Sequence, residues 1–88
     1  MRLETKIINK LGLHARAAAK FVSLASSFAS DIKVSKEDQT VNGKSIMGVI
    51  MLAAAKDTSL LLIIDGEDEE EAATGLCGLI NNRFGEEE

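Results

Sequence analysis

The sequence predicts a two-layer α+β domain in which helices cover one face of a sheet. The chain has 88 residues, of which 45% are hydrophobic, the composition of a globular protein with one core. Some segments repeat apolar residues with the period of a strand and others with the period of a helix, in the order β-α-β-β-α-β-α. Because domains usually run to about 100–150 residues, we expect a single domain over residues 1–88.

Four segments have the patterns of strands. Residues 3–7 and 32–35 alternate apolar and polar side chains, as half-buried strands do. Residues 40–42 form a third candidate, which the pair Asn42-Gly43 ends. Residues 60–64 are an unbroken aliphatic run, which predicts a central strand buried at least in part on both faces.

Three segments have the patterns of helices. Residues 15–28 are rich in helix formers and carry one apolar stripe with i, i+3, i+4 spacing. The stripe consists of Ala18, Phe21, Val22, Ala25 and Phe28. Ser45 precedes the apolar run 46–52, so it is the candidate N-cap of a short helix. The acidic residues 68–71 stand where a last helix should begin, since negative charge suits the positive end of a helix dipole.

The last helix is expected to pack closely on the sheet. Its predicted inner face consists of Ala72, Ala73, Leu76, Leu79 and Ile80. Gly75 and Gly78 each cost a helix about 1 kcal/mol relative to alanine, which close packing on the sheet would explain. Arg83 and Gly85 are ordinary signals of a helix end, and the glutamates at 86–88 predict a frayed acidic tail.

Charge and composition argue against several classes of function. A net charge of −4 and a pI near 5.0 do not suit the phosphate backbone of a nucleic acid, and three Phe without Tyr or Trp offer few stacking platforms. No segment approaches the ~18 apolar residues of a membrane span, so we expect no membrane insertion. One histidine and one cysteine without a matching ligand cluster predict neither a metal nor another cofactor.

Cys77 bears on the compartment. As the only cysteine it excludes an intramolecular disulfide and fits a reducing environment, so a cytoplasmic protein is expected. It stands among Leu76, Leu79 and Ile80, which favours a small buried hydrophobic residue over a reactive thiol.

His14, the only histidine, immediately precedes the first predicted helix. One interpretation is a histidine that caps the helix or lies in a surface loop. The other is chemical: free N–H groups and the positive dipole end make a helix N-terminus a site for an anion, and a neutral imidazole there has a lone pair for nucleophilic attack. Arg16 can add a forked cation for a phosphoryl group, and Gly12 allows a tight turn before the histidine.

Two motifs resemble a known family. Residues 12–16 read Gly-Leu-His-Ala-Arg, and residues 42–48 read Asn-Gly-Lys-Ser-Ile-Met-Gly. At this separation and in a chain of this length, they closely resemble the HPr family, the histidine-containing phosphocarriers of the bacterial phosphotransferase system. The resemblance extends to the element order and to the acidic start of the last helix, so it covers essentially the whole chain.

The resemblance implies both a fold and a role. The fold is an open-faced sandwich, a four-stranded antiparallel sheet with three helices on one side. The role is that His14 accepts a phosphoryl group on Nδ1 from phosphorylated enzyme I, which takes it from phosphoenolpyruvate. His14 then passes it to the A domain of an enzyme II, in sugar uptake or in a nitrogen-related branch. Arg16 matches the active-site arginine of the family. Such a chain is a phosphoryl carrier rather than a stand-alone catalyst, and we expect a monomer.

Ala17 departs from the family pattern, which usually has proline after the arginine. Proline would pre-set the first helical turn and would lack an N–H. Alanine keeps the helix propensity and adds a donor near the site. We therefore expect altered stability or phosphohistidine lifetime rather than loss of function.

Ser45 has two interpretations. As an N-cap it stabilises its helix by about 1 kcal/mol. In HPr-like proteins with a matching kinase, an HPr kinase/phosphorylase, the serine at this position is also phosphorylated, and the helix dipole would tolerate that charge. This leaves open a second function, a regulatory binding module whose partner choice is switched by phosphorylation at Ser45 or His14. A third alternative is an unrelated small α+β domain with a capping histidine.

The resemblance also implies a docking surface beside His14. Its candidate residues are Ala15, Ala19, Lys20, Ile46, Met47 and Met51. Methionine suits a surface that must fit several partners, although each large apolar side chain of the short helix could instead pack inward. Lys20 and Lys44 could frame the surface against acidic partners or simply be solvated.

Overall fold

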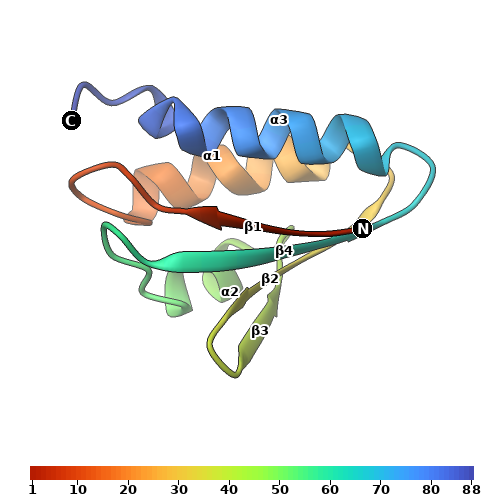
Figure 1. Ribbon diagram of the computed structural model, residues 1–88, viewed down its shortest axis with the longest axis horizontal. Helices are drawn as coiled ribbons and strands as arrows, with labels where there is room; N and C mark the ends of the chain where they lie inside the picture. Colours follow the sequence, from red (N-terminus) through yellow and green to blue (C-terminus); the bar gives the residue numbers. More distant parts are fainter.

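The computed structural model describes residues 1–88 as two layers, a sheet and a set of helices (Figure 1). The elements in chain order are β1 (Arg2–Lys6), α1 (Ala15–Ser26), β2 (Asp31–Lys36), β3 (Gln39–Asn42), α2 (Ile46–Met51), β4 (Ser59–Asp65), α3 (Glu69–Asn81) and a final 3₁₀ turn (Arg83–Gly85). The four strands form one antiparallel sheet in the order β1-β4-β2-β3. The predicted α+β sandwich is confirmed, and none of its helices is long and apolar enough to cross a membrane.

β4 is the central strand that the aliphatic run predicts. It pairs with β1 on one side and β2 on the other. Leu60, Leu62 and Ile64 are buried beneath the helices, whereas Leu61 and Ile63 face the open side of the sheet and are half-buried. The partial burial of both faces is therefore confirmed.

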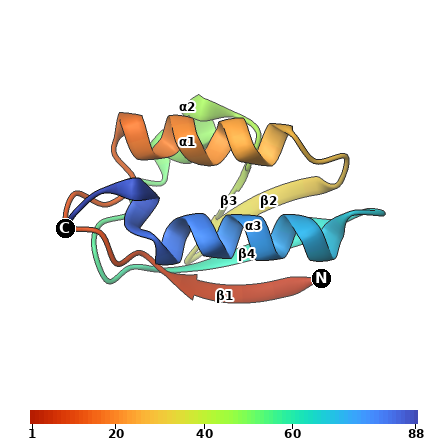
Figure 2. The same cartoon turned by 90° about the horizontal axis from the view of Figure 1, so that it is seen from above.

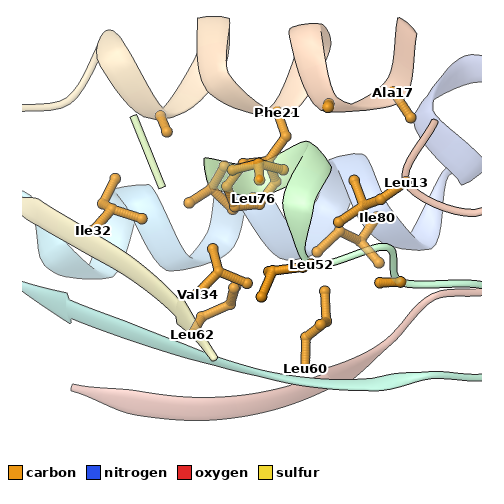
Figure 3. Packing of buried hydrophobic residues seen from close by; sticks show 14 of the residues in the cluster. Leu13, Ala17, Phe21, Ile32, Val34, Leu52, Leu60, Leu62, Leu76 and Ile80 are labelled. Atoms are coloured by element: carbon orange, nitrogen blue, oxygen red, sulfur yellow. The ribbon is translucent and has the colours of Figure 1, made fainter. Parts of the chain in front are cut away.

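One core of 19 buried residues joins the helices to the covered face of the sheet. Figure 3 shows Phe21 of α1 and Leu76 of α3 lying over Val34 and Leu62 of the sheet. α2 contributes Val49 to the same core. Because all three helices share this core, they cover the same face.

α1 buries the stripe that its spacing predicts, with two adjustments. Ala17, Ala18, Phe21 and Ala25 are buried, whereas Val22 and Phe28 are half-buried. α1 ends at Ser26, so Phe28 lies beyond the helix and contacts the core from the following loop.

At the acidic start of α3, Asp68 bonds to another part of the chain, whereas the dipole argument predicts only an interaction with its own helix. Asp68 stands at the N-cap position but makes no side-chain cap. Its carboxylate instead accepts hydrogen bonds from the backbone N–H groups of Ala29 (2.8 Å) and Ser30 (2.9 Å) and from the Ser30 hydroxyl. The hydroxyl of Ser30, followed by the Ala29 N–H, lowers the pKa of Asp68. Asp68 thus ties α3 to the loop between α1 and β2.

The inner face of α3 is close to the prediction, but its glycines are not explained by the sheet. Ala72, Ala73, Leu76 and Ile80 are buried and Leu79 is half-buried. A Cβ on Gly75 would lie 3.3 Å from the Phe28 ring, so Gly75 allows close contact with the α1 region rather than with the sheet. A Cβ on Gly78 would meet nothing within 4 Å. The predicted packing of both glycines on the sheet is therefore wrong. Cys77, between them, is half-buried against the core, and burial raises the pKa of its thiol.

The C-terminal tail differs from the frayed end that its charge predicts. Phe84 is fully buried and anchors the chain after α3. Gly85 then turns the backbone with a φ of +79°, and the tail runs back to the loop after β1 (Figure 2). There the Lys10 N–H donates to the Glu88 carbonyl at 2.8 Å. The buried aromatic ring holds down a segment that would otherwise be solvated.

Candidate functional site

His14 is the N-cap residue of α1. Its backbone is extended (φ −72°, ψ 175°), and its carbonyl accepts the first helical hydrogen bond, from Ala18 N at 2.8 Å. The predicted N-cap position is confirmed, but the His14 ring makes no capping hydrogen bond, so only the backbone of His14 caps the helix. The side chain is 28% exposed, and it lies beside the free N–H groups of the first turn of the helix.

The loop before His14 is fixed by a close approach of two backbones. Gly12 has a φ of +68°, and a Cβ there would lie 2.5 Å from the Ala54 carbonyl oxygen, so only glycine fits. Leu13, which is buried, donates its N–H to the same carbonyl at 2.8 Å. These contacts fix the position of His14 at the start of α1.

Glu86, from the C-terminal tail, contacts the His14 ring. Its Oε2 pairs with His14 Nε2, and its Oε1 accepts a hydrogen bond from Asn9 Nδ2 at 3.0 Å. The Asn9 amide also donates to the Gly12 carbonyl at 2.8 Å, so the amide protons of Asn9 serve two acceptors. A flipped amide would set Oδ1 against both oxygens, which fixes its orientation and leaves Oδ1 buried without a partner.

These contacts determine the charge of Glu86 and the tautomer of the His14 ring. Hydrogen bonds from Asn9 and then from His14 lower the pKa of the Glu86 carboxyl, so Glu86 is a carboxylate at neutral pH. A carboxylate only accepts, so Nε2 must carry the proton in this contact. In the neutral ring the lone pair is then on Nδ1, which makes no hydrogen bond within the chain.

Arg16 extends from the first turn of α1 beside the histidine. It is exposed and lines, with His14, Lys20 and the tail, an open cavity at this end of the molecule. Its guanidinium forms none of the ion pairs of the structure. The fork is thus available to an anion in the cavity. Ala17, at the position where the family usually has proline, is fully buried.

The two lysines that could frame the docking surface both donate hydrogen bonds to backbone carbonyls of the chain. Lys20 Nζ donates to the Phe84 carbonyl at 2.6 Å, and Lys44 Nζ donates to the Phe28 carbonyl at 2.7 Å. Neither is the freely solvated cation that the sequence suggests. Lys20 remains exposed beside the cavity, where its charge still reaches the tail.

The large apolar residues of α2 point outward. Met47 is 63% and Met51 65% exposed, and Ile46 is also exposed. Ala15 and Ala19 are exposed on α1, which packs beside α2 (Figure 2). Sequence reasoning missed Leu11, an exposed leucine that lines the cavity around His14. The signal was an apolar residue in the loop directly before Gly12, where no element would bury it.

Ser45 forms the predicted cap. Its hydroxyl accepts a hydrogen bond from Gly48 N at 3.2 Å. Asn42 Oδ1 accepts from Lys44 N at 2.9 Å and fixes the turn that leads into the helix. No group of His, Cys, Asp and Glu side chains is placed to hold a metal ion.

Comparison with known proteins identifies the class. The family described as "PTS HPr component phosphorylation site" matches residues 1–82. The phosphocarrier protein HPr of Neisseria meningitidis serogroup A is 57% identical over 88 residues, which are 100% of this chain and 99% of that protein. The chain is therefore a phosphocarrier of the phosphotransferase type. It belongs to the HPr family.

Solved structures agree with the match. HPr-C-His from Thermoanaerobacter tengcongensis superimposes with a TM-score of 0.96 at 46% identity, covering 100% of this chain and 99% of that chain. An HPr dimer from the same organism has a TM-score of 0.80 at 49% identity, covering 93% of this chain and 94% of that chain. The fold is thus that of HPr, and a relative forms dimers.

Proposed function

We propose that His14 accepts a phosphoryl group from phosphorylated enzyme I and passes it to the A domain of an enzyme II, in the cytoplasm. The observation that carries the proposal is a half-buried histidine at the N-terminus of α1 whose Nδ1 is free while Nε2 is engaged by Glu86. Family membership supports the phosphotransferase system as the context.

The reaction uses the local electrostatics. The phosphoryl group added to Nδ1 sits beside the first-turn N–H groups and the positive end of the α1 dipole. Arg16 offers a planar fork of donors to the phosphoryl oxygens and balances their charge during transfer. The chain is a carrier, since the group that enters at His14 leaves from the same nitrogen.

Partners dock on the exposed apolar residues beside the histidine. Ile46, Met47 and Met51 on α2 supply adaptable contact area, with Ala15 and Ala19 on α1 allowing close approach. Leu11 extends this surface across the cavity, and Lys20 adds positive charge. We propose that the monomer is the transferring species, even though an HPr of Thermoanaerobacter tengcongensis forms a dimer.

A second function, regulation at Ser45, is supported by one observation. The Ser45 hydroxyl caps α2 directly before the exposed Ile46 and Met47. A phosphate placed there by an HPr kinase/phosphorylase would keep the capping role and add negative charge to the edge of the docking surface.

Phosphorylation of the lone histidine tests the main proposal. The protein is incubated with phosphoenolpyruvate and enzyme I, and its intact mass is measured. Wild type should gain one phosphoryl group that is labile in acid and stable in base, whereas His14→Ala should fold and gain none, because the chain has no other histidine.

Ser45→Ala is the control for that experiment. It should still be phosphorylated, because the acceptor is not the serine. Undiminished phosphorylation of His14→Ala, or none of wild type, contradicts the proposal.

A further inference from the structure

We propose that Glu86 is a positioning residue for phosphoryl transfer, which holds the proton of His14 on Nε2 and balances the charge that the ring gains when Nδ1 is phosphorylated. The inference rests on the proposed function at His14. Nothing in the local sequence points to it, because 72 positions separate the two residues.

The Glu86 side chain is fixed by contacts, unlike the side chain of a freely solvated tail residue. It is only 16% exposed, and each carboxylate oxygen has a partner, His14 on one and Asn9 on the other. Asn9 is itself fully buried and bound to the Gly12 carbonyl. The carboxylate is therefore fixed to the same loop that positions the histidine.

The tail is anchored on both sides of Glu86. Before it, Phe84 is buried and its carbonyl accepts a hydrogen bond from Lys20 Nζ at 2.6 Å. After it, the Glu88 carbonyl accepts the Lys10 N–H, and the Glu88 carboxylate lies 3.5 Å from Lys10 Nζ. With both flanks anchored, little conformational entropy remains to be lost when Glu86 meets the ring.

The step balances without moving a proton. The Nδ1 lone pair forms a bond to phosphorus, and the bond between phosphorus and the donor atom breaks with its electron pair going to the donor. The neutral ring with a proton on Nε2 becomes a phosphorylated imidazolium that keeps that proton. Glu86 lies at Nε2, where the positive charge appears, so its carboxylate stabilises the ring as the charge develops. In the reverse direction the ring leaves as neutral imidazole, with its Nε2 proton still in place.

The contact of Glu86 orients the His14 ring and does not block the nitrogen that attacks phosphorus. A tail that shielded the histidine would cover the attacking nitrogen, but Glu86 engages Nε2 and leaves Nδ1 without a partner. The two roles predict opposite signs. Loss of Glu86 slows transfer if the residue positions the ring, and speeds transfer if it shields the ring.

The experiment uses the full-length chain and two donors. Phosphoramidate, a small chemical donor of phosphoryl groups, reports on the ring without any docking surface, and enzyme I with phosphoenolpyruvate reports on the biological reaction. The variants are Glu86→Gln, which removes the charge at nearly constant shape, and Glu86→Ala, which removes the contact. Glu87→Gln and Glu87→Ala are matched controls, because Glu87 is an exposed neighbour whose side chain makes no hydrogen bond.

The expected results are kinetic and spectroscopic. Glu86→Gln should slow phosphorylation by phosphoramidate about tenfold or more, the size expected for a charge-assisted hydrogen bond, while the Glu87 controls keep the wild-type rate. With enzyme I the loss should fall on kcat and not on KM. In the NMR spectrum of the unphosphorylated protein, the Nε2-bound proton of His14 should be visible in wild type and Glu87→Ala and lost to exchange in Glu86→Ala.

The product isomer is a further readout that a merely structural role would not change. Wild type should carry phosphate on Nδ1, and Glu86→Ala should also form the Nε2 isomer, distinguishable by phosphorus NMR. A Glu86→Gln rate equal to or above wild type with phosphoramidate, or an Nε2 proton signal unchanged in Glu86→Ala, overturns the inference. Failure of enzyme I to phosphorylate wild type would overturn the proposed function alone, because the phosphoramidate and NMR results do not depend on that enzyme.

Discussion

At the scale of single residues, His14 depends on neighbours from three parts of the chain. Gly12 fixes the approach of the loop to the Ala54 carbonyl, and α1 supplies the N–H groups next to the ring. Glu86 arrives from the opposite end of the sequence. The surroundings of the His14 ring therefore depend on where the loop before α1, the start of α1 and the C-terminal tail meet.

Ser45 is the residue at which stability and docking can be separated. Ser45→Ala loses the hydrogen bond from Gly48 N and should reduce the free energy of unfolding by about 1 kcal/mol, with nearly normal transfer. Ser45→Asp keeps a capping oxygen, so it should melt within a few degrees of wild type, yet its charge beside Ile46 and Met47 should weaken binding of enzyme I. Melting curves and rates of His14 phosphorylation measure the two effects.

Thr74→Asp is the matched control, since it adds the same charge on the exposed side of α3. Its transfer rate should equal that of wild type. Added salt should restore part of the Ser45→Asp loss, because the repulsion is screened. A Ser45→Asp variant that transfers as fast as wild type at low salt would leave Ser45 as a cap alone.

Much of the site follows from the sequence, and the missing part has a physical reason. Ser45 could be predicted as a cap because its hydroxyl bonds to a residue three positions on. Glu86 could not, because a run of glutamates is ordinarily solvated and its partner lies 72 positions away. The available signal was Phe84: a large aromatic residue just beyond a helix must be buried somewhere, and its burial brings the following residues to the protein surface.

At the scale of elements, α3 carries two glycines with different environments. Both cost helix propensity, by about 1 kcal/mol relative to alanine. Gly78→Ala should raise the free energy of unfolding by up to about 1 kcal/mol, because a Cβ there meets nothing within 4 Å. Gly75→Ala should gain less or lose stability, because its Cβ would lie 3.3 Å from the Phe28 ring. Thermal melting of the two single variants gives the comparison, and a larger gain at position 75 would contradict this account.

Element types were predictable where the apolar pattern was strong. The unbroken aliphatic run at 60–64 predicts a strand with apolar side chains on both faces, and β4 indeed lies between β1 and β2 in the sheet. The outward face of α2 could not be decided, because a six-residue helix with Ile46, Met47 and Met51 has too little polar surface to define a solvent side. The packing partner of Gly75 was equally hidden, since it depends on how α3 crosses the end of α1 rather than on either sequence alone.

At the scale of the whole molecule, α1 and α3 run in opposite directions and are tied together at both ends (Figure 2). At the end that carries His14, Lys20 and Glu86 connect α1 to the tail after α3. At the other end, Asp68 holds Ala29 and Ser30. At each end of the helical layer, a carboxylate, Glu86 or Asp68, therefore bonds to a residue far away in the sequence.

The hydrogen bonds of the Asp68 carboxylate to Ala29 and Ser30 make the stability of the fold depend on pH in a defined direction. Folding lowers the pKa of Asp68 below its ordinary value of 3.8, chiefly through the Ser30 hydroxyl and the Ala29 N–H. The stabilisation is therefore present above that value and is lost as the pH falls through the lowered pKa. Asp68→Asn should melt at a lower temperature than wild type at pH 7, and the two melting temperatures should converge toward pH 3. Glu70→Gln, which removes an exposed charge from the same helical turn, should stay close to wild type at both pH values. A gap between wild type and Asp68→Asn that persists undiminished at pH 3 would mean that the contact stabilises the fold through shape and not through the charge of the carboxylate.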